Sequence, residues 1–304
     1  MLGTAAVGKP KPPPARPTPA ETFPVKTSQT FDGLTAIRFL RREPGTNRVI
    51  GDRFGIQGRG PAVTIRYDAA AGTYTVQDDL ASASFGASNL ASTSKGFEVY
   101  TKTGGTVSDT LNLLVNARPG APKASAPLQL SYLSLAIWGH TDSLSGDNRK
   151  TYILFGFPTG AANMPRTGSA SYRTFVTGTR TERAPSMAVT RELEIRGSAS
   201  LTANFATGAI ATQLVLTPLT GPGSFGTFVG TGAIYDGTDQ FGGTFASTNP
   251  NFWNGGFYGS FYGPGAKEMG YGFMTSEYNP DPYAGAAVVP MYVSMTGTVA
   301  GTKK

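Results

Sequence analysis

The sequence predicts an all-β protein, in which an N-terminal β-rich domain is followed by an eight-stranded antiparallel up-and-down β-barrel. Short runs of alternating apolar and polar residues recur along the chain and are rich in β-branched and aromatic residues, as half-buried strands are. The 304 residues include 40 glycines and 22 prolines, which are typical of turns. No segment has the 3.6-residue apolar period of an amphipathic helix.

Residues 1–24 form the first predicted segment, a proline-rich disordered stalk. Six prolines lie in the segment from Lys9 to Pro19, and they favour extended polyproline geometry over a helix or a central strand. The segment lacks the roughly 7–15-residue apolar core of a secretory signal. A stalk of this kind is expected to follow a lipid-bearing cysteine or a removed signal peptide.

Residues 25–155 are predicted to form the β-rich domain. Alternating runs indicate strands near 36–41, 62–67, 72–76, 97–100 and 128–138. The interval 79–94 is rich in Ala, Ser and Asn and is predicted to be a loop. Residues 38–66 hold seven arginines against Glu43 and Asp52. This basic stretch is either a solvated sheet face or a surface for an acidic protein or anionic lipid.

Residues 156–304 are predicted to form the barrel. Strand-length runs recur here with glycine turns and no long crossovers, near 168–178, 190–206, 209–217, 226–235, 239–247, 255–263, 268–276 and 289–299. Eight sequential strands are the number needed for a small up-and-down barrel. Closure removes the edge strands that would otherwise promote aggregation.

Three segments of this second domain, 164–172, 201–208 and 256–273, carry a family resemblance. In order and spacing they resemble the barrel domain of bacterial transferrin-binding-protein-B-like surface lipoproteins, a group with factor-H-binding and haem-capturing members. The resemblance covers about residues 156–300, and the preceding "handle" domain is matched only loosely. The sequence departs from the family pattern at Tyr271, where a second adjacent glycine is usual. The motif residues are Gly168, Phe261, Tyr262, Gly263, Pro264, Glu268 and Gly270.

This motif is interpreted as a fold signature rather than an active site. Phe257, Phe261 and Phe273 are expected to point inward and fill the barrel. The carboxylate of Glu268, at the start of a strand, is expected to accept backbone N–H groups of the preceding turn.

The resemblance implies a surface-exposed or secreted capture protein that works beside a TonB-dependent outer-membrane receptor. Such proteins deliver iron, haem or another scarce solute, taken directly or from a carrier protein, and an outer-membrane export translocon often recognises their barrel. Most members are anchored through an N-terminal cysteine, which this chain lacks. Two alternatives are a surface protein that binds a host or neighbouring protein without transport, and a barrel that holds an apolar ligand in its lumen.

His140 is the one histidine and the candidate haem ligand. It follows a strand and precedes a polar loop, and an exposed imidazole there is suited to axial ligation of haem iron. The apolar slot that haem needs is assigned to Tyr132, Leu135 and Trp138. The alternative is an ordinary loop histidine near the domain junction.

Partner contacts are assigned to two groups of side chains. The proline-stiffened loop 277–283 carries Tyr278 and Tyr283, and a pre-ordered aromatic loop loses little entropy on binding. The arginines Arg38, Arg41 and Arg42 form the second group. The alternative for the tyrosines is that they fill the barrel wall.

Other function classes lack their residues. Without cysteine there is no thiol nucleophile, disulfide or thiolate zinc site, and no Gly-x-Ser-x-Gly elbow is present. The loop 142–148 has the acidic residues Asp142 and Asp147 but no EF-hand spacing, so it is interpreted as a polar turn. Glu192 and Glu194 have arginine neighbours and are interpreted as surface ion pairs. No recognition helix or RNA-type aromatic motif accompanies the arginines. We therefore expect neither an enzyme nor a nucleic-acid-binding protein, and no metal site.

Overall fold

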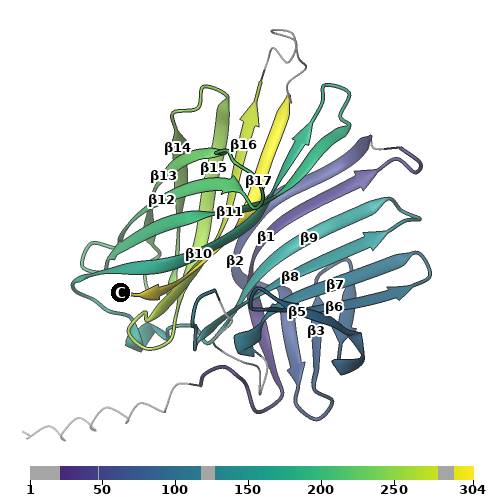
Figure 1. The fold of residues 1–304 in the computed structure, drawn as a ribbon. Coiled ribbons are helices and arrows are strands. Elements are labelled where there is room, and N and C mark those ends of the chain that lie inside the picture. The colour runs from purple at the N-terminus through teal and green to yellow at the C-terminus, as the bar shows by residue number, and fades with distance from the viewer. Residues whose placement is uncertain (1–20, 47, 118–126, 280–290) are drawn as a thin grey trace, which may run out of the picture.

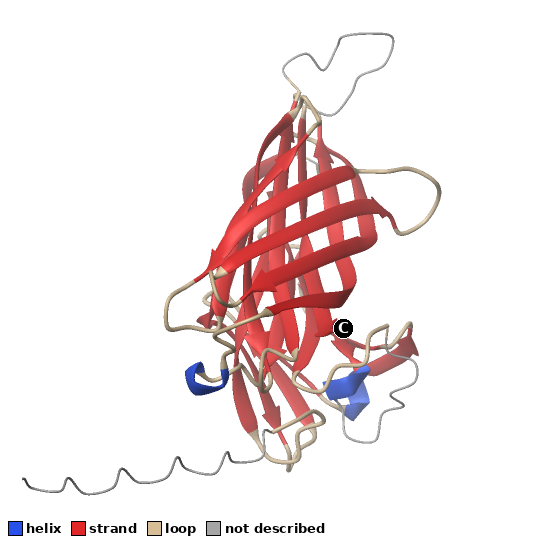
Figure 2. Cartoon of the chain, turned by 90° about the vertical axis from the view of Figure 1, so that its left-hand side faces the viewer, coloured by secondary structure: helices blue, strands red, loops and turns tan. Residues whose placement is uncertain are grey.

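The computed structural model describes residues 21–46, 48–117, 127–279 and 291–304. Its strands form two units that pack side by side, a nine-stranded sheet and a closed barrel (Figure 1). Short 3-10 turns such as Ala87–Asn89 and Ala161–Asn163 interrupt a chain that is otherwise strands and loops (Figure 2). Among the described residues, no helix has the length and apolarity needed to span a bilayer.

The nine-stranded sheet is the handle domain, and its strands are β1 (Gln29–Arg42), β2 (Val49–Asp68), β3 (Thr73–Gln77), β4 (Ser82–Phe85), β5 (Leu90–Ser94), β6 (Phe97–Gly104), β7 (Val107–Leu114), β8 (Leu133–Asp142) and β9 (Asp147–Gly156). Their order in the sheet is β4-β3-β2-β1-β9-β8-β7-β6-β5. The long curved strands β1 and β9 therefore lie at the centre of the sheet.

The barrel consists of β10 (Ser169–Arg183), β11 (Val189–Asn204), β12 (Ala209–Pro218), β13 (Gly226–Ile234), β14 (Gln240–Ser247), β15 (Phe252–Tyr262), β16 (Glu268–Tyr278) and β17 (Tyr292–Lys303). Each strand pairs antiparallel with the next, and β17 closes the barrel on β10. The predicted fold class, an all-β handle followed by an eight-stranded up-and-down barrel, is confirmed.

Two sequence expectations about the handle are wrong. The interval 79–94 is not a loop, because it contains β4 and β5. In β4 the side chains of Ala83 and Phe85 are buried and those of the two serines are exposed, so this strand alternates although most of its residues are small. The predicted stalk also ends too late, since Phe23 is 3% exposed and packs in the handle core. Residues 1–20 of that stalk lie outside the described residues.

The barrel interior is packed with aromatic rings. Phe257, Phe261 and Phe273 point inward as expected, and each is 0% exposed. The rings of Phe241 and Phe261 lie 4.9 Å apart, and the hydroxyl of Tyr271 is 3.0 Å from Thr212 Oγ1. Rings of this size fill an eight-stranded barrel, so this part of the lumen leaves no room for an apolar ligand.

Strands β1, β8 and β9 are buried on both faces, because one face packs in the handle core and the other packs on the barrel. In β8, Ala136 and Trp138 belong to the handle core, while Leu133 and Leu135 lie in a separate cluster with Tyr262 of the barrel. Alternate residues of a strand point to opposite faces. The near-continuous apolar run 133–138 thus reflects burial between two domains.

The motif at 256–273 joins the barrel to the handle. The Glu268 carboxylate accepts the backbone N–H groups of Ser131, Tyr132 and Leu133 at 2.7, 2.9 and 2.8 Å. The expectation that Glu268 accepts N–H groups of its own turn is therefore wrong, since the donors belong to the handle. Burial raises the pKa of Glu268, against the lowering effect of these three donors.

The motif glycines allow close approach at this interface. A methyl group on Gly270 would lie 2.7 Å from Leu154 Cδ1 of β9 and 3.1 Å from Leu133 Cδ2 of β8. A methyl group on Gly263 would overlap the Tyr132 ring, and Gly263 also has a φ of +71°. Gly168 has a φ of +77° and makes the turn into β10. These residues therefore have a structural role, as the interpretation of a fold signature requires.

Candidate functional site

The candidate site lies at one end of the handle sheet, where four charged or polar side chains and one phenylalanine line up across five strands. Strand register places Lys102 opposite Asp109, Asp109 opposite His140, His140 opposite Arg149, and Arg149 opposite Phe39. We call this row the handle mouth, since the apolar handle core lies on the same face, one residue pair deeper. The row brings together charged residues that are far apart in the sequence.

Asp109 is the hub of the handle mouth. Its Oδ1 accepts the indole N–H of Trp138 at 3.0 Å and lies 2.8 Å from His140 Nδ1. The side chains of Asp109 and His140 are 10% and 14% exposed. A carboxylate on Nδ1 fixes the imidazole tautomer and orientation. The other ring nitrogen, Nε2, has no hydrogen-bond partner among the described residues and is therefore the atom left to bind a ligand.

Arg149 forms the second part of the handle mouth. Its guanidinium lies 5.3 Å from the centre of the Trp138 ring and 2.5 Å from Asp78 Oδ2. Asp78 also accepts the backbone N–H groups of Leu80 and Ala81, each at 2.8 Å. Arg149 is thus held on both sides, by a ring and by a carboxylate. The pair is 5% and 9% exposed and makes a rigid polar wall.

A cavity of about 340 Å³ lies beside this wall. Its apolar lining comes from Ile37, Phe39, Val63 and Leu80, and Arg149 and Asp78 line its polar side. Leu80 is 64% exposed. The cavity thus combines apolar surface with one buried cation and one buried anion, and His140 lies in the next strand position.

The structure brings together two of the three predicted haem-site residues. The rings of Trp138 and His140 lie 5.9 Å apart. Tyr132 lies instead at the domain interface, against Gly263 and with Lys267 Nζ 5.5 Å from its ring. Trp138 is 1% exposed, and Leu135 points to the barrel side. The expected slot of Tyr132, Leu135 and Trp138 is therefore not formed, because these residues alternate between two faces of the sheet.

Of the predicted partner residues, Arg38 is 4% exposed and forms an ion pair with Glu192 of the barrel. Burial, and secondly the charge of Arg42, lower the pKa of Arg38 to about 10. This arginine joins the two domains and is not available to a partner.

The remaining predicted partner residues are more open. Arg41 is half exposed and pairs with Asp147 at 2.7 Å, while Arg42 pairs with Glu192 at 3.3 Å. Tyr278 is 37% exposed and packs against Tyr292 with 5.3 Å between ring centres. Tyr283 lies outside the described residues. Partner binding by Arg41, Arg42 and Tyr278 stays a prediction.

Asp109 and Arg149 of the handle mouth, and Asp78, which pairs with Arg149, were not predicted. Asp109 follows Ser108 in a polar stretch, and Asp78 lies in a turn, so neither stands out from the sequence. Their placement depends on the register between β7, β8 and β9. No local pattern within these strands shows which residue of one strand faces which residue of the next.

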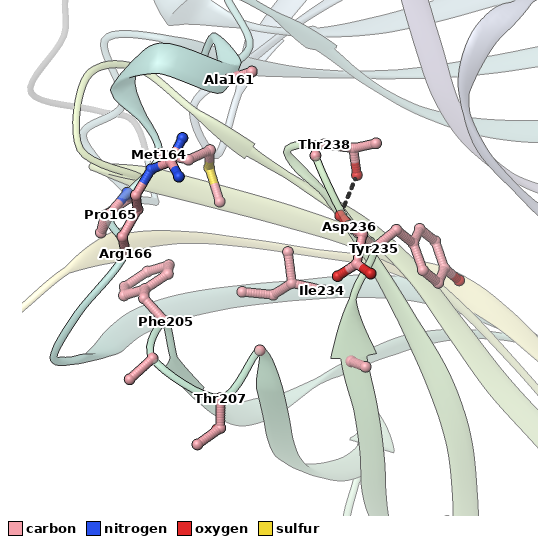
Figure 3. Close-up of a pocket in the computed structure, with 14 residues that line it drawn as sticks. Ala161, Met164, Pro165, Arg166, Phe205, Thr207, Ile234, Tyr235, Asp236 and Thr238 are labelled. Atoms are coloured by element: carbon pink, nitrogen blue, oxygen red, sulfur yellow. Dashed lines mark hydrogen bonds between the residues drawn. The ribbon is translucent and has the colours of Figure 1, made fainter.

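A second cavity, of about 520 Å³, lies at the base of the barrel (Figure 3). Met164, Phe205 and Ile234 give it an apolar floor, and Arg166 and Asp236 stand at its two sides (Figure 3). None of the predicted site residues lines it. Its chemistry suits a small ligand with an apolar body, but both of its charged residues are exposed.

Comparisons with known proteins found relatives of the fold. No family model matches the chain, and no curated protein matches it. Among solved structures, the chain is similar to intact Ap-TbpB with its N and C lobes, at 12% identity, 94% coverage of this chain, 79% of the other and a TM-score of 0.44.

Two further structures are similar over the same share of the chain. HpuA from Kingella denitrificans, in complex with human haemoglobin, is 16% identical over 94% of this chain and 90% of the other, with a TM-score of 0.34. Transferrin binding protein B from serogroup B Neisseria meningitidis is 11% identical over 94% and 78%, with a TM-score of 0.32.

Proposed function

We propose that this chain is a bacterial cell-surface or secreted binding protein that captures haem at the handle mouth. The observation that carries this proposal is the arrangement around His140. Asp109 Oδ1 lies 2.8 Å from Nδ1 and also accepts the Trp138 N–H, so in the neutral ring Nδ1 carries the proton and Nε2 is the nitrogen left for a ligand. A neutral imidazole oriented by a carboxylate is a strong axial ligand for haem iron.

The surroundings of His140 suit a porphyrin. Phe39 and Leu80 offer apolar surface beside Arg149. Exposed cations stand at both ends of the row, Lys102 two strands from His140 and Arg53 opposite Phe39. With strands about 4.8 Å apart, these cations lie roughly 10 and 14 Å from His140. Lysine and arginine at such sites pair with carboxylates, which haem carries as propionates.

The same arrangement supports binding rather than catalysis. An Asp–His pair acts in acyl transfer only when a nucleophile completes it. No described side chain hydrogen-bonds to Nε2 of His140. The handle mouth therefore has a nitrogen that can bind a ligand and an apolar surface, but no described nucleophile is hydrogen-bonded to that nitrogen.

Delivery to a TonB-dependent outer-membrane receptor is the second part of the proposal, and it rests on the sequence resemblance. The source of the haem is free haem or a haem-carrying protein. The alternative function is a surface protein that binds a host or neighbouring protein without passing on a solute. Arg41 is half exposed and Tyr278 is exposed, and both side chains are open to a protein partner whether or not the chain passes on a solute.

The test is an absorbance titration of the purified chain with haemin. We expect a shifted Soret band that saturates at one haemin per chain, and its loss in His140→Ala. Lys267→Ala serves as the matched control, because Lys267 contacts Tyr132 at the domain interface and not the handle mouth. A spectrum equal to free haemin, or an unchanged shift in His140→Ala, overturns haem capture at this site. A pull-down with the receptor then tests the alternative.

A further inference from the structure

The cavity at the base of the barrel (Figure 3) has a floor and walls that are already fixed. The Phe205 ring on its floor is 8% exposed and lies 5.6 Å from the ring of Phe261 in the barrel core. The backbone N–H of Phe205 donates to the Gly168 carbonyl at 2.9 Å. The N–H of Ile234 donates to the Gly208 carbonyl at 2.8 Å. A ligand of this cavity therefore needs to order little of the protein when it binds.

Opposite charges stand at the two sides of this cavity. Arg166 lies on the side of Phe205, and Asp236 lies on the side of Tyr235 (Figure 3). Lys303 adds a second cation next to Phe205, because its Nζ lies 5.8 Å from that ring. Neither Arg166 nor Asp236 forms an ion pair with any residue that the structure describes. Both charges are thus open to groups of a ligand.

This charge arrangement restricts the chemistry of the ligand. An anionic group suits the side with Arg166 and Lys303, and a cationic group suits the side with Asp236. A fatty acid would satisfy the two cations but would place its alkyl chain against the Asp236 carboxylate, which is unfavourable. A molecule with a carboxylate at one end, an ammonium at the other and apolar side chains between them satisfies both sides. A short apolar peptide with free ends has this chemistry.

The size of the cavity sets the length of such a peptide. A sphere with the cavity volume of about 520 Å³ is about 10 Å across, and three extended residues span at most about 10–11 Å. A single amino acid is too short to reach both sides. A peptide much longer than three residues would have to leave the cavity at one end.

We propose that this cavity binds an apolar peptide of about three residues with free ends. Its carboxylate pairs with Arg166 and Lys303, its ammonium pairs with Asp236, and its side chains cover Met164 and Ile234 on the floor. The cavity lies in the barrel and shares no residue with the handle mouth, so this proposal does not depend on haem capture. Because the charged side chains are exposed, each ion pair contributes modestly.

The test is isothermal titration calorimetry of the full chain with the tripeptide Leu-Ala-Leu and two capped forms of it. We expect the free tripeptide to bind with a Kd of about 10–100 µM. N-acetylation removes its ammonium and C-amidation removes its carboxylate. Each cap is expected to weaken binding about three- to tenfold, because one ion pair is lost.

Substitutions assign each end of the peptide to its side of the cavity. Arg166→Gln combined with Lys303→Gln should remove the difference in affinity between the free and the amidated peptide. Asp236→Asn should remove the difference between the free and the acetylated peptide. All three side chains are exposed, so these variants are expected to fold as the parent does.

Matched controls carry the same charge changes on exposed residues outside the cavity. They are Lys26→Gln combined with Arg196→Gln for the cations, and Asp32→Asn for the carboxylate. Both control proteins should bind all three peptides as the parent does. A loss of binding in the controls would show that the net charge of the chain, and not this cavity, determines the affinity, and would overturn the proposal.

Other results also overturn the proposal. Absence of binding by the free tripeptide at millimolar concentration excludes a peptide site. Equal affinities of the free and capped peptides exclude recognition of the two ends. Binding that the Arg166, Lys303 and Asp236 substitutions leave unchanged occurs elsewhere on the chain. If dodecanoate binds more tightly than the tripeptide and Asp236→Asn does not affect either ligand, the cavity is a site for an apolar carboxylate instead.

Discussion

Glu268 of the barrel accepts the backbone N–H of Leu133 of the handle at 2.8 Å, although 135 residues separate them in the sequence. The same carboxylate also holds the N–H groups of Ser131 and Tyr132. Three backbone donors of one segment therefore depend on a single side chain of the other domain. This anchor fixes the start of β8, the strand that carries Trp138 and His140 to the handle mouth.

The first prediction concerns this anchor. Glu268→Gln places an amide nitrogen, a donor, against backbone N–H donors, and leaves at least one of them unpaired in a site that is 1% exposed. We expect a loss of about 2–4 kcal/mol in the free energy of unfolding, measured by urea denaturation.

Glu43→Gln is the matched control for this change, because the Glu43 side chain is 46% exposed and lies 3.9 Å from Arg48. It should cost less than about 0.5 kcal/mol. Equal effects of the two substitutions would contradict the role of Glu268 as the domain anchor.

The second prediction concerns the close packing at Gly270. In Gly270→Ala the new methyl group would lie 2.7 Å from Leu154 Cδ1 and push β9 away from β16. Overpacking of this kind costs about 1–3 kcal/mol, so a lower melting temperature is expected by calorimetry. Gly104→Ala, where a methyl group meets no atom within 4 Å, should leave the melting temperature within experimental error. A Gly270→Ala protein as stable as the parent would show that the interface has room for the added methyl group.

The barrel was predictable from the sequence, because its signals are local. Strand-length alternation and glycine turns recur at a spacing that permits only sequential pairing, and all eight predicted strands overlap the observed ones. The handle was harder to predict. In β9, the polar start at Asp147 and the apolar run at 152–155 do not alternate, because both faces of its second half are buried.

The candidate site was predictable only in part, for a physical reason. His140 was found because it is the one histidine, and Trp138 because it shares its strand. Asp109 and Arg149 reach His140 through the register of two neighbouring strands, and such pairing leaves no trace within either segment. Arg38 was predicted to bind a partner, but it forms an ion pair with Glu192 of the barrel. That pair could not be predicted, because the sequence does not show which handle strand packs on which barrel strand.

The third prediction separates the role of Asp109 from that of the apolar surface, and it rests on the proposed function. Asp109→Asn removes the carboxylate charge from His140 and leaves one amide oxygen for two donors, the imidazole and the Trp138 N–H. Loss of such a partner typically lowers metal-ligand affinity by about 10–100-fold, and we expect that loss for haemin by fluorescence quenching. Thr110→Ala, at the adjacent exposed position of β7, should bind haemin as the parent does. Unchanged affinity in Asp109→Asn would mean that His140 needs no orienting partner.

The last prediction concerns pH and Glu277, near the end of β16. Its side chain is 10% exposed, its Oε1 has no partner among the described residues, and Arg180 lies 3.9 Å from its Oε2. Arg180 also pairs with Glu182 at 2.7 Å, so its charge is shared. Burial therefore raises the pKa of Glu277 despite the opposing charge of Arg180.

The sign of the pH effect follows from this raised pKa. Between the ordinary glutamate pKa of about 4.3 and the higher value in the folded protein, the folded state holds a proton that the unfolded state has lost. The free energy of unfolding of the parent should therefore fall as the pH rises through this window, while Glu277→Gln lacks this term. The stability of the variant relative to the parent should increase with pH and then level off, measured by urea denaturation from about pH 4 to about pH 7. Other groups cancel in the difference, Glu268 among them, and a pH-independent difference would mean that Glu277 stays ionised in the folded barrel.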